Sequence, residues 1–230
     1  MSTLTDNYDS VIKRIENARK RAASDPHTTL IAVSKTHPAS DIQTLYDHGV
    51  RIFGENKVQE LCDKYEVLPK DIEWHLIGHL QTNKVKYLIG KVALIHSVDS
   101  VHLAEQISKE AMKKDTVMDI LLEVNVSGED SKFGLAPKQT EDAARQISAL
   151  PGVRIKGLMT IAPFVTDPQE NREFFAKLRQ LSVDIAEKNI DNVSMDFLSM
   201  GMTGDFEVAV EEGAGFVRVG TAIFGERDYT

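Results

Sequence analysis

The chain has 230 residues, of which 42% are apolar and 27% are charged, a balance typical of a globular protein and not of a disordered or fibrous one. Its length suits one domain spanning residues 1–230. The net charge of −8 argues against general binding to nucleic acids or anionic membranes, because both require clustered Lys and Arg side chains.

The single cysteine, Cys62, excludes an internal disulfide bond and fits a reducing compartment. No apolar run approaches the roughly 18–20 residues that a membrane span requires. The first residues lack the apolar stretch of a secretory signal. We therefore expect a cytoplasmic protein without membrane contact, and a monomer, because no segment reads as a dedicated interface.

The chain begins with a predicted helix, Leu4–Ala22, and then alternates between short apolar runs and longer amphipathic stretches. The predicted strands are Thr29–Ser34, Val50–Phe53, Glu73–Ile77, Val92–Ser97, Met118–Asn125, Val153–Thr160, Met195–Ser199 and Phe216–Val219. The predicted helices between them are Ala39–His48, Asn56–Tyr65, Thr82–Leu88, Val101–Lys114, Lys138–Leu150, Gln169–Glu187 and Phe206–Glu212.

Eight such units at this length predict a single α/β domain, a (β/α)8 TIM-type barrel preceded by an N-terminal helix. A doubly wound open sheet is the rival, because alternation alone does not count strands reliably. In a barrel, functional residues lie at the carboxyl ends of the strands. The polar and glycine-rich residues found there are Lys35, Glu55, Asn56, His79, Asp99, Asn125, Thr160, Ser199, Gly201, Arg218, Gly220 and Thr221.

Lys35 follows the first predicted strand. It is either an exposed lysine or a Schiff-base lysine, whose neutral amine is favoured by apolar surroundings and attacks an aldehyde. Two glycine turns, 199–205 and 215–225, follow the last two strands, where barrels commonly bind phosphate. The first of them could instead be an ordinary turn, with Thr203 or Asp205 as a helix cap. Strand alternation points Arg218 into the barrel mouth, toward a ligand or a neighbouring acid.

Asn56 could bind a ligand hydroxyl or cap the helix that follows it. His79 reads as a polar wall of the pocket. His75 and His79 lack the helical context of a zinc motif, so no metal is expected. The sequence also lacks a dinucleotide-binding glycine motif, a phosphate-binding Walker loop and a serine-hydrolase elbow.

Six ordered motifs together resemble the pyridoxal phosphate homeostasis protein family. They are IAVSKT (31–36), FGENKVQE (53–60), HLIGHLQTNK (75–84), GLMT (157–160), SMGM (199–202) and RVGTAIFG (218–225). The resemblance implies a barrel similar to the N-terminal domain of alanine racemase, with pyridoxal 5′-phosphate held as an aldimine on Lys35. It further implies the contacts of nine other residues: Ser199, Gly201, Gly220 and Thr221 with the phosphate, Arg218 with the pyridine nitrogen, Asn56 and His79 along the cofactor, and Met159 and Met200 nearby.

Two positions depart from the family pattern. Position 37 is His, close to Lys35, and position 203 is Thr where Ser is usual. An arginine at the pyridine nitrogen discourages its protonation and makes the ring a poor electron sink. The resemblance therefore implies a protein that buffers and delivers pyridoxal phosphate, with apo-enzymes that use this cofactor as partners, and not an enzyme. The alternatives are a weak amino-acid racemase, another lysine-dependent barrel such as an aldolase, and an interaction protein that merely retains the cofactor.

Overall fold

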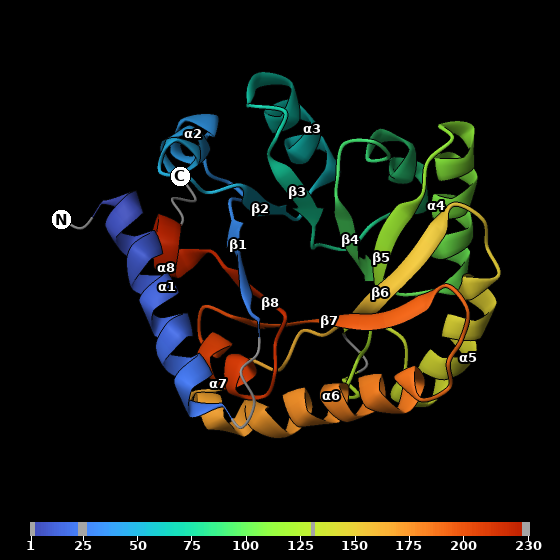
Figure 1. Cartoon of the computed structure of the whole chain (residues 1–230). Coiled ribbons are helices and arrows are strands. Elements are labelled where there is room, and N and C mark those ends of the chain that lie inside the picture. Colours follow the sequence, from blue (N-terminus) through green and yellow to red (C-terminus); the bar gives the residue numbers. More distant parts are fainter. Residues whose placement is uncertain (1–2, 23–26, 130–131, 227–230) are drawn as a thin grey trace.

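Eight parallel strands close into a barrel in the computed structural model, which describes residues 3–22, 27–129 and 132–226 (Figure 1). The strands follow sequence order around the barrel: β1 Thr29–Val33, β2 Ile52–Glu55, β3 Glu73–Leu76, β4 Leu94–Val98, β5 Met118–Glu123, β6 Val153–Met159, β7 Val193–Met202 and β8 Phe216–Val219. β8 closes the barrel against β1, with Leu30 paired to Val217. The predicted barrel is confirmed and the open-sheet alternative is wrong.

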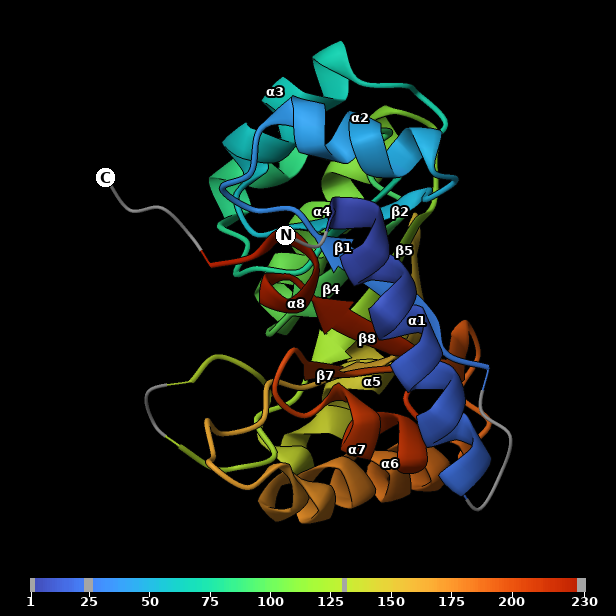
Figure 2. The same ribbon diagram turned by 90° about the vertical axis from the view of Figure 1, so that its left-hand side faces the viewer.

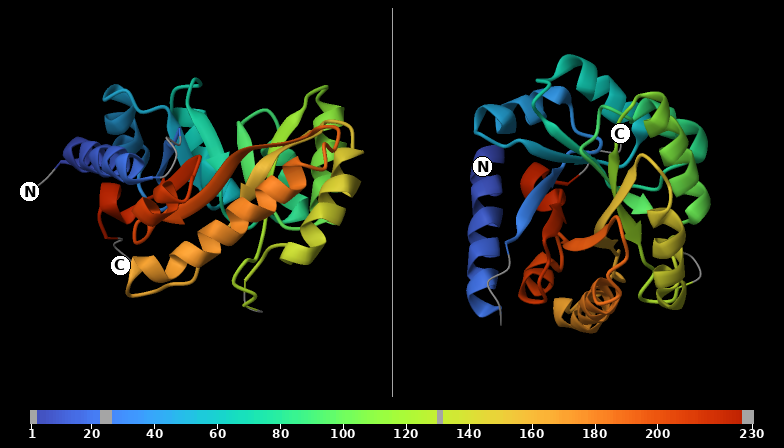
Figure 3. Two further views of the ribbon diagram at one scale, coloured as in Figure 1. Left: turned by 60° about the horizontal axis from the view of Figure 1, so that its bottom comes forward. Right: turned by 45° about the vertical axis from the view of Figure 1, so that its right-hand side comes forward.

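Helices surround the barrel because each carries one apolar face. They are α1 Leu4–Arg21, α2 Ala39–Asp47, α3 Val58–Val67, α4 Val101–Lys113, α5 Pro137–Ser148, α6 Arg172–Ala186, α7 Phe206–Glu211 and α8 Thr221–Phe224, with 3₁₀ helices η1 Thr82–Tyr87 and η2 Pro168–Asn171. Helix α6 lies along the outside of β7 (Figure 3). Apolar side chains between the strands and the helices form the larger part of the core.

The N-terminal helix α1 packs against α7 and α8, two short helices that follow the last two strands (Figure 2). Thr3 and Asp6 cap its first turn reciprocally, which satisfies backbone N–H groups that the helix cannot pair internally. Val11 and Ile15 are buried on its inner face, and the Asn7 side-chain amide donates to the Ile223 carbonyl at 3.0 Å. The helix therefore supports the two chain segments that follow β7 and β8.

Three predicted elements differ from the structure in type or by more than two residues, whereas the bounds of the others agree to within two residues. Residues 82–88 were expected as an α-helix and form the 3₁₀ helix η1. The expected helix 169–187 begins with η2 and becomes α-helical at Arg172. Strand β7 continues three residues beyond Ser199, with a register shift against β8 between Ser199 and Met202. At Gly201, φ is +86°, and a Cβ atom there would lie 2.5 Å from Ala209, so only glycine allows this close approach to α7.

None of the helices in the described parts of the chain has the length and apolarity that crossing a bilayer requires.

Candidate functional site

A cavity of about 280 Å³ opens at the carboxyl end of the barrel. Its lining comes from the ends of β1, β7 and β8 and from the segments that follow β1, β2, β3, β6, β7 and β8. The lining residues are Val33, Lys35, Asn56, Ile77, Ile161, Met202, Thr203, Gly204, Arg218, Gly220 and Thr221. The location is that expected for the site of a barrel protein.

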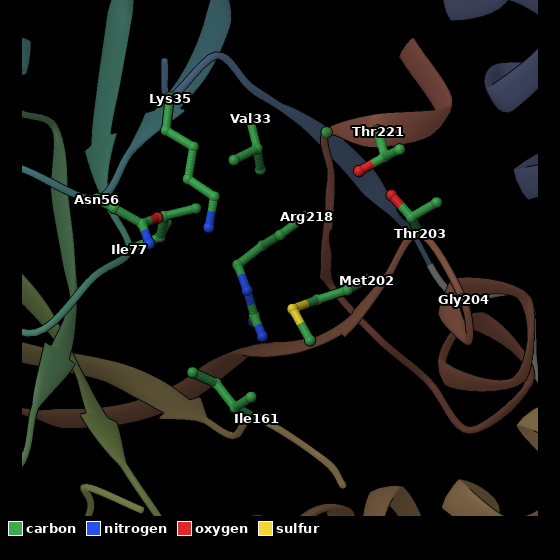
Figure 4. Close-up of a pocket in the computed structure, with 11 residues that line it drawn as sticks. Val33, Lys35, Asn56, Ile77, Ile161, Met202, Thr203, Gly204, Arg218 and Thr221 are labelled. Carbon is green, nitrogen blue, oxygen red and sulfur yellow. The ribbon is translucent and has the colours of Figure 1, made fainter. Parts of the chain in front are cut away.

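The polar groups of the cavity are distributed over two sides (Figure 4). The amine of Lys35 and the amide of Asn56 lie on one side, whereas the hydroxyls of Thr203 and Thr221 face each other on the other side. The Arg218 side chain lies between these two sides. An elongated ligand with an anion at one end and an electrophile at the other could contact all three kinds of group at once.

Arg218 supplies a buried positive charge, since its residue is only 4% exposed. One terminal nitrogen donates to Ser199 Oγ at 2.6 Å and the other to the Thr160 carbonyl at 2.9 Å. In the described part of the chain both partners are uncharged oxygens, so the salt-bridge alternative is wrong. Burial lowers the pKa of Arg218 to about 10, and the charges of Glu123 and Asp205 oppose this shift. The guanidinium is thus still cationic at neutral pH.

A chain of hydrogen bonds extends from Arg218 across the barrel interior. Ser199 Oγ lies 2.8 Å from His96 Nδ1, and His96 Nε2 lies 2.8 Å from His75 Nδ1. Since arginine can only donate, Ser199 Oγ accepts from Arg218. The same hydroxyl also pairs with His96 Nδ1, so the chain joins Arg218 to both histidine rings. Burial lowers the pKa of His75 to about 4 and that of His96 well below its usual value, so both rings are neutral.

Comparison with known proteins identifies the family to which the chain belongs. Residues 7–228 match the family described as "Alanine racemase, N-terminal domain". The pyridoxal phosphate homeostasis protein of Aquifex aeolicus is 48% identical over 97% of this chain and 98% of its own length. That of Pseudomonas aeruginosa is 40% identical over 100% and 98%. The chain belongs to the pyridoxal phosphate homeostasis protein family.

Solved structures agree with this assignment. PipY of Synechococcus elongatus, in a structure described as having pyridoxal phosphate bound, superposes with a TM-score of 0.80 at 37% identity, covering 93% of this chain and 99% of that one. An alanine racemase of Clostridium difficile has a TM-score of 0.72 at 13% identity, which shows a shared fold. That match covers 95% of this chain and 57% of the racemase.

Five of the ten expected site residues line the cavity: Lys35, Asn56, Arg218, Gly220 and Thr221. The helix after Asn56 begins at Val58 and has Lys57 at its N-cap, so the alternative that Asn56 caps it is wrong. Asn56 instead lies against Gly78, where a Cβ atom would come within 2.5 Å of the Asn56 carbonyl oxygen. Gly78 therefore permits the close approach that places Asn56.

The other five expected residues lie elsewhere. Ser199, Met159 and Met200 are fully buried and do not line the cavity. The structure gives the Ser199 hydroxyl a different partner from the expected phosphate, namely Arg218. Gly201 faces α7. Contacts of these four residues with a ligand stay predictions.

His79 lies beside the cavity, in an adjoining pocket that shares Asn56 with it. Its ring stacks on Phe133 at 3.9 Å between centroids, and its Nδ1 lies 3.3 Å from Asp99. Among the residues that the structure describes, no group of three or more His, Cys, Asp or Glu side chains is placed to hold a metal ion.

Sequence reasoning missed part of the lining. Thr203 and Gly204 belong to the glycine turn that is expected to suit a phosphate, but neither is among the ten expected site residues. Val33, Ile77, Ile161 and Met202 supply apolar walls. Alternation along β1 carried a signal for Val33, because side chains two residues apart in a strand face the same side. Nothing local in the sequence marks Ile161, whose loop reaches the cavity only in the folded chain.

Proposed function

We propose that this protein binds pyridoxal 5′-phosphate at Lys35, buffers it, and delivers it to apo-enzymes without turning over amino acids. The observation that carries the proposal is the placement of a lysine amine and two threonine hydroxyls on opposite sides of one cavity, with Arg218 between them. The membership of the chain in the pyridoxal phosphate homeostasis family supports it. A cytoplasmic monomer suffices for this role, because every group that the proposal uses lies in one chain.

The residues present fit this cofactor. Thr203 and Thr221 offer hydroxyl donors to a phosphate, and Gly204 and Gly220 let backbone N–H groups approach it closely. Arg218 faces the middle of the cavity, where the pyridine ring would lie. When bound, the cofactor supplies an aldehyde, which condenses with a lysine amine and releases one water molecule. Lys35 would provide that amine, and Asn56 would contact the ring from the same side.

The cavity favours holding the cofactor over using it. Arg218 keeps a positive charge at neutral pH, and a like charge nearby disfavours a proton on the pyridine nitrogen. Within the described lining, Lys35 and Arg218 are the only titratable side chains. A racemase requires proton-transferring groups on both faces of its ligand. We therefore expect no useful turnover.

The first test is trapping with borohydride. Purified protein supplied with pyridoxal phosphate should absorb visible light, and after reduction peptide mapping should find the label on Lys35. Lys35→Ala should lose the absorbance, whereas Lys57→Ala, an exposed lysine of the adjoining pocket, should retain it. A colourless wild-type protein, or a label on another lysine, would exclude the proposed site.

The second test separates a carrier from a weak racemase, the alternative that the racemase-like barrel favours. The loaded protein is incubated with alanine and other amino acids in deuterated water, and exchange at the α-carbon is followed by proton NMR. We expect no exchange above that of free cofactor. Rapid exchange would favour the racemase alternative. Delivery is measured separately, as reactivation of an apo-enzyme by the loaded protein.

A further inference from the structure

The turn that carries Lys35 is strained. Thr36, the next residue, has φ of +69°, in the left-handed region. This region is unfavourable for a β-branched residue and persists only where surrounding contacts offset the strain. Something must therefore hold the backbone of this turn.

Three hydrogen bonds hold the turn on both sides of Lys35. The Thr36 amide donates to Glu60 Oε1 at 2.5 Å. On the other side, Ser34 Oγ donates to Glu55 Oε1 at 2.7 Å, and the Ser34 carbonyl accepts from Lys64 Nζ at 2.8 Å. The residues immediately before and after Lys35 are thus both tied to side chains of β2 and α3.

Lys64 joins these contacts into one cluster. Its ammonium also donates to Glu55 Oε1 and to Glu60 Oε1, both at 2.7 Å, so its three N–H donors are all used. Lys64 is only 7% exposed and Glu55 is fully buried. Breaking such a buried pair costs far more than breaking a surface pair, because it leaves an uncompensated charge. Glu55, Glu60 and Lys64 do not line the cavity.

We propose that Glu55, Glu60 and Lys64 form a clamp that fixes the Ser34–Thr36 turn, so that the Lys35 amine is directed into the cavity. The three are positioning residues, because they act on the cofactor only through the backbone around Lys35. This inference rests on the proposed function, since it concerns the amine that binds the cofactor. The same contacts exclude Lys64 as an amine that competes with Lys35 for the cofactor, because all three N–H donors of Lys64 are used.

The variant Glu60→Gln tests the clamp without leaving a buried charge unpaired, because Glu55 still faces Lys64. It weakens the bond to Thr36, so the strained turn relaxes. We expect the affinity for pyridoxal phosphate, measured by absorbance titration, to fall about tenfold, the factor that one charge-assisted hydrogen bond supplies. Glu66→Gln is the matched control: it removes the ion pair with Lys91 from the same helix and should not change the affinity.

Rescue by a second substitution distinguishes positioning from general damage. Glycine adopts positive φ without strain, so Thr36→Gly no longer needs the clamp to hold the turn. The double variant Thr36→Gly/Glu60→Gln should regain an affinity within about twofold of Thr36→Gly alone. In the ligand-free protein, hydrogen exchange at the amide of residue 36 should be faster in Glu60→Gln than in wild type.

The outcomes separate the two proposals. A wild-type protein that is not labelled at Lys35 removes the proposed function and this inference with it. If wild type is labelled, the clamp is excluded when Glu60→Gln binds as tightly as wild type, when it weakens binding no more than Glu66→Gln does, or when Thr36→Gly fails to restore the affinity.

Discussion

At the scale of single residues, Arg218 is connected by hydrogen bonds to groups that do not line the cavity. Its guanidinium donates to Ser199, whose hydroxyl pairs with His96, and His96 in turn pairs with His75. The arginine is thereby held by a network in which every member is buried. Such networks are stable when fully satisfied and costly when one member is removed.

Ser199→Ala should therefore do more than remove a hydroxyl. It leaves one nitrogen of Arg218 and one of His96 without the Ser199 partner, and both residues are buried. We expect the free energy of unfolding, measured by urea denaturation, to fall by about 1–3 kcal/mol, the cost of leaving buried polar groups unsatisfied. The absorbance of the loaded protein should also change, because Arg218 keeps only its hydrogen bond to the Thr160 carbonyl and is less firmly held.

Ser182→Ala provides the comparison. This serine is also buried, but it lies on α6 and donates to the Arg179 carbonyl at 2.7 Å within its own helix. Its loss should lower the free energy of unfolding by less than the loss of Ser199 does, and it should leave the absorbance of the loaded protein unchanged. If the two variants behave alike, the network does not hold Arg218.

At the scale of elements, the sequence predicted what depends on local pattern. Each of the eight apolar runs became a strand, because buried strands of a parallel barrel read as continuous apolar segments. The ends of elements were harder to predict. Strand β7 continues past Ser199 because Gly201 lets it approach α7, and Asn56 stays outside α3 because Gly78 packs against it. Both contacts join segments that are separated in the sequence, so neither has a local signal.

The same reason explains how much of the site could be predicted. Lys35, Arg218 and the two glycine turns lie at strand ends and were found from the barrel rule. The clamp behind Lys35 was not found, because Glu60 and Lys64 read as an ordinary i,i+4 pair on a helix surface. Only the fold shows that Lys64 is buried, and Glu60 half-buried, against the turn after β1. His75 and His96 likewise meet only because β3 and β4 are neighbours.

At the scale of the whole molecule, buried titratable groups make stability depend on pH in two opposite ways. Burial lowers the pKa of His75 from 6.5 to about 4. The neutral buried ring therefore contributes fully to the stability of the fold above pH 6.5, and this contribution is lost as the pH falls toward 4. Burial, aided by the charge of Asp99, raises the pKa of Glu123 from 4.5 to about 7. Its contribution is complete below pH 4.5 and is lost as the pH rises through 7. The two slopes cancel between pH 4.5 and 6.5, so these two groups predict the greatest and nearly constant stability in that range, with a decrease on either side.

Glu123→Gln isolates the second of these effects, because an amide stays neutral at every pH. Below pH 4.5 the variant and wild type should unfold at similar free energies. As the pH rises from 4.5 through 7, the carboxyl of wild type ionises in the unfolded chain while it stays protonated in the folded one, so wild type loses stability and the variant does not. The shift in pKa corresponds to as much as about 3 kcal/mol. Urea denaturation at pH 4.5, 6 and 8 measures the difference, with the exposed Glu16→Gln as control. A difference that does not grow with pH would show that Glu123 is ionised in the folded protein throughout this range, with its charge compensated by Arg218.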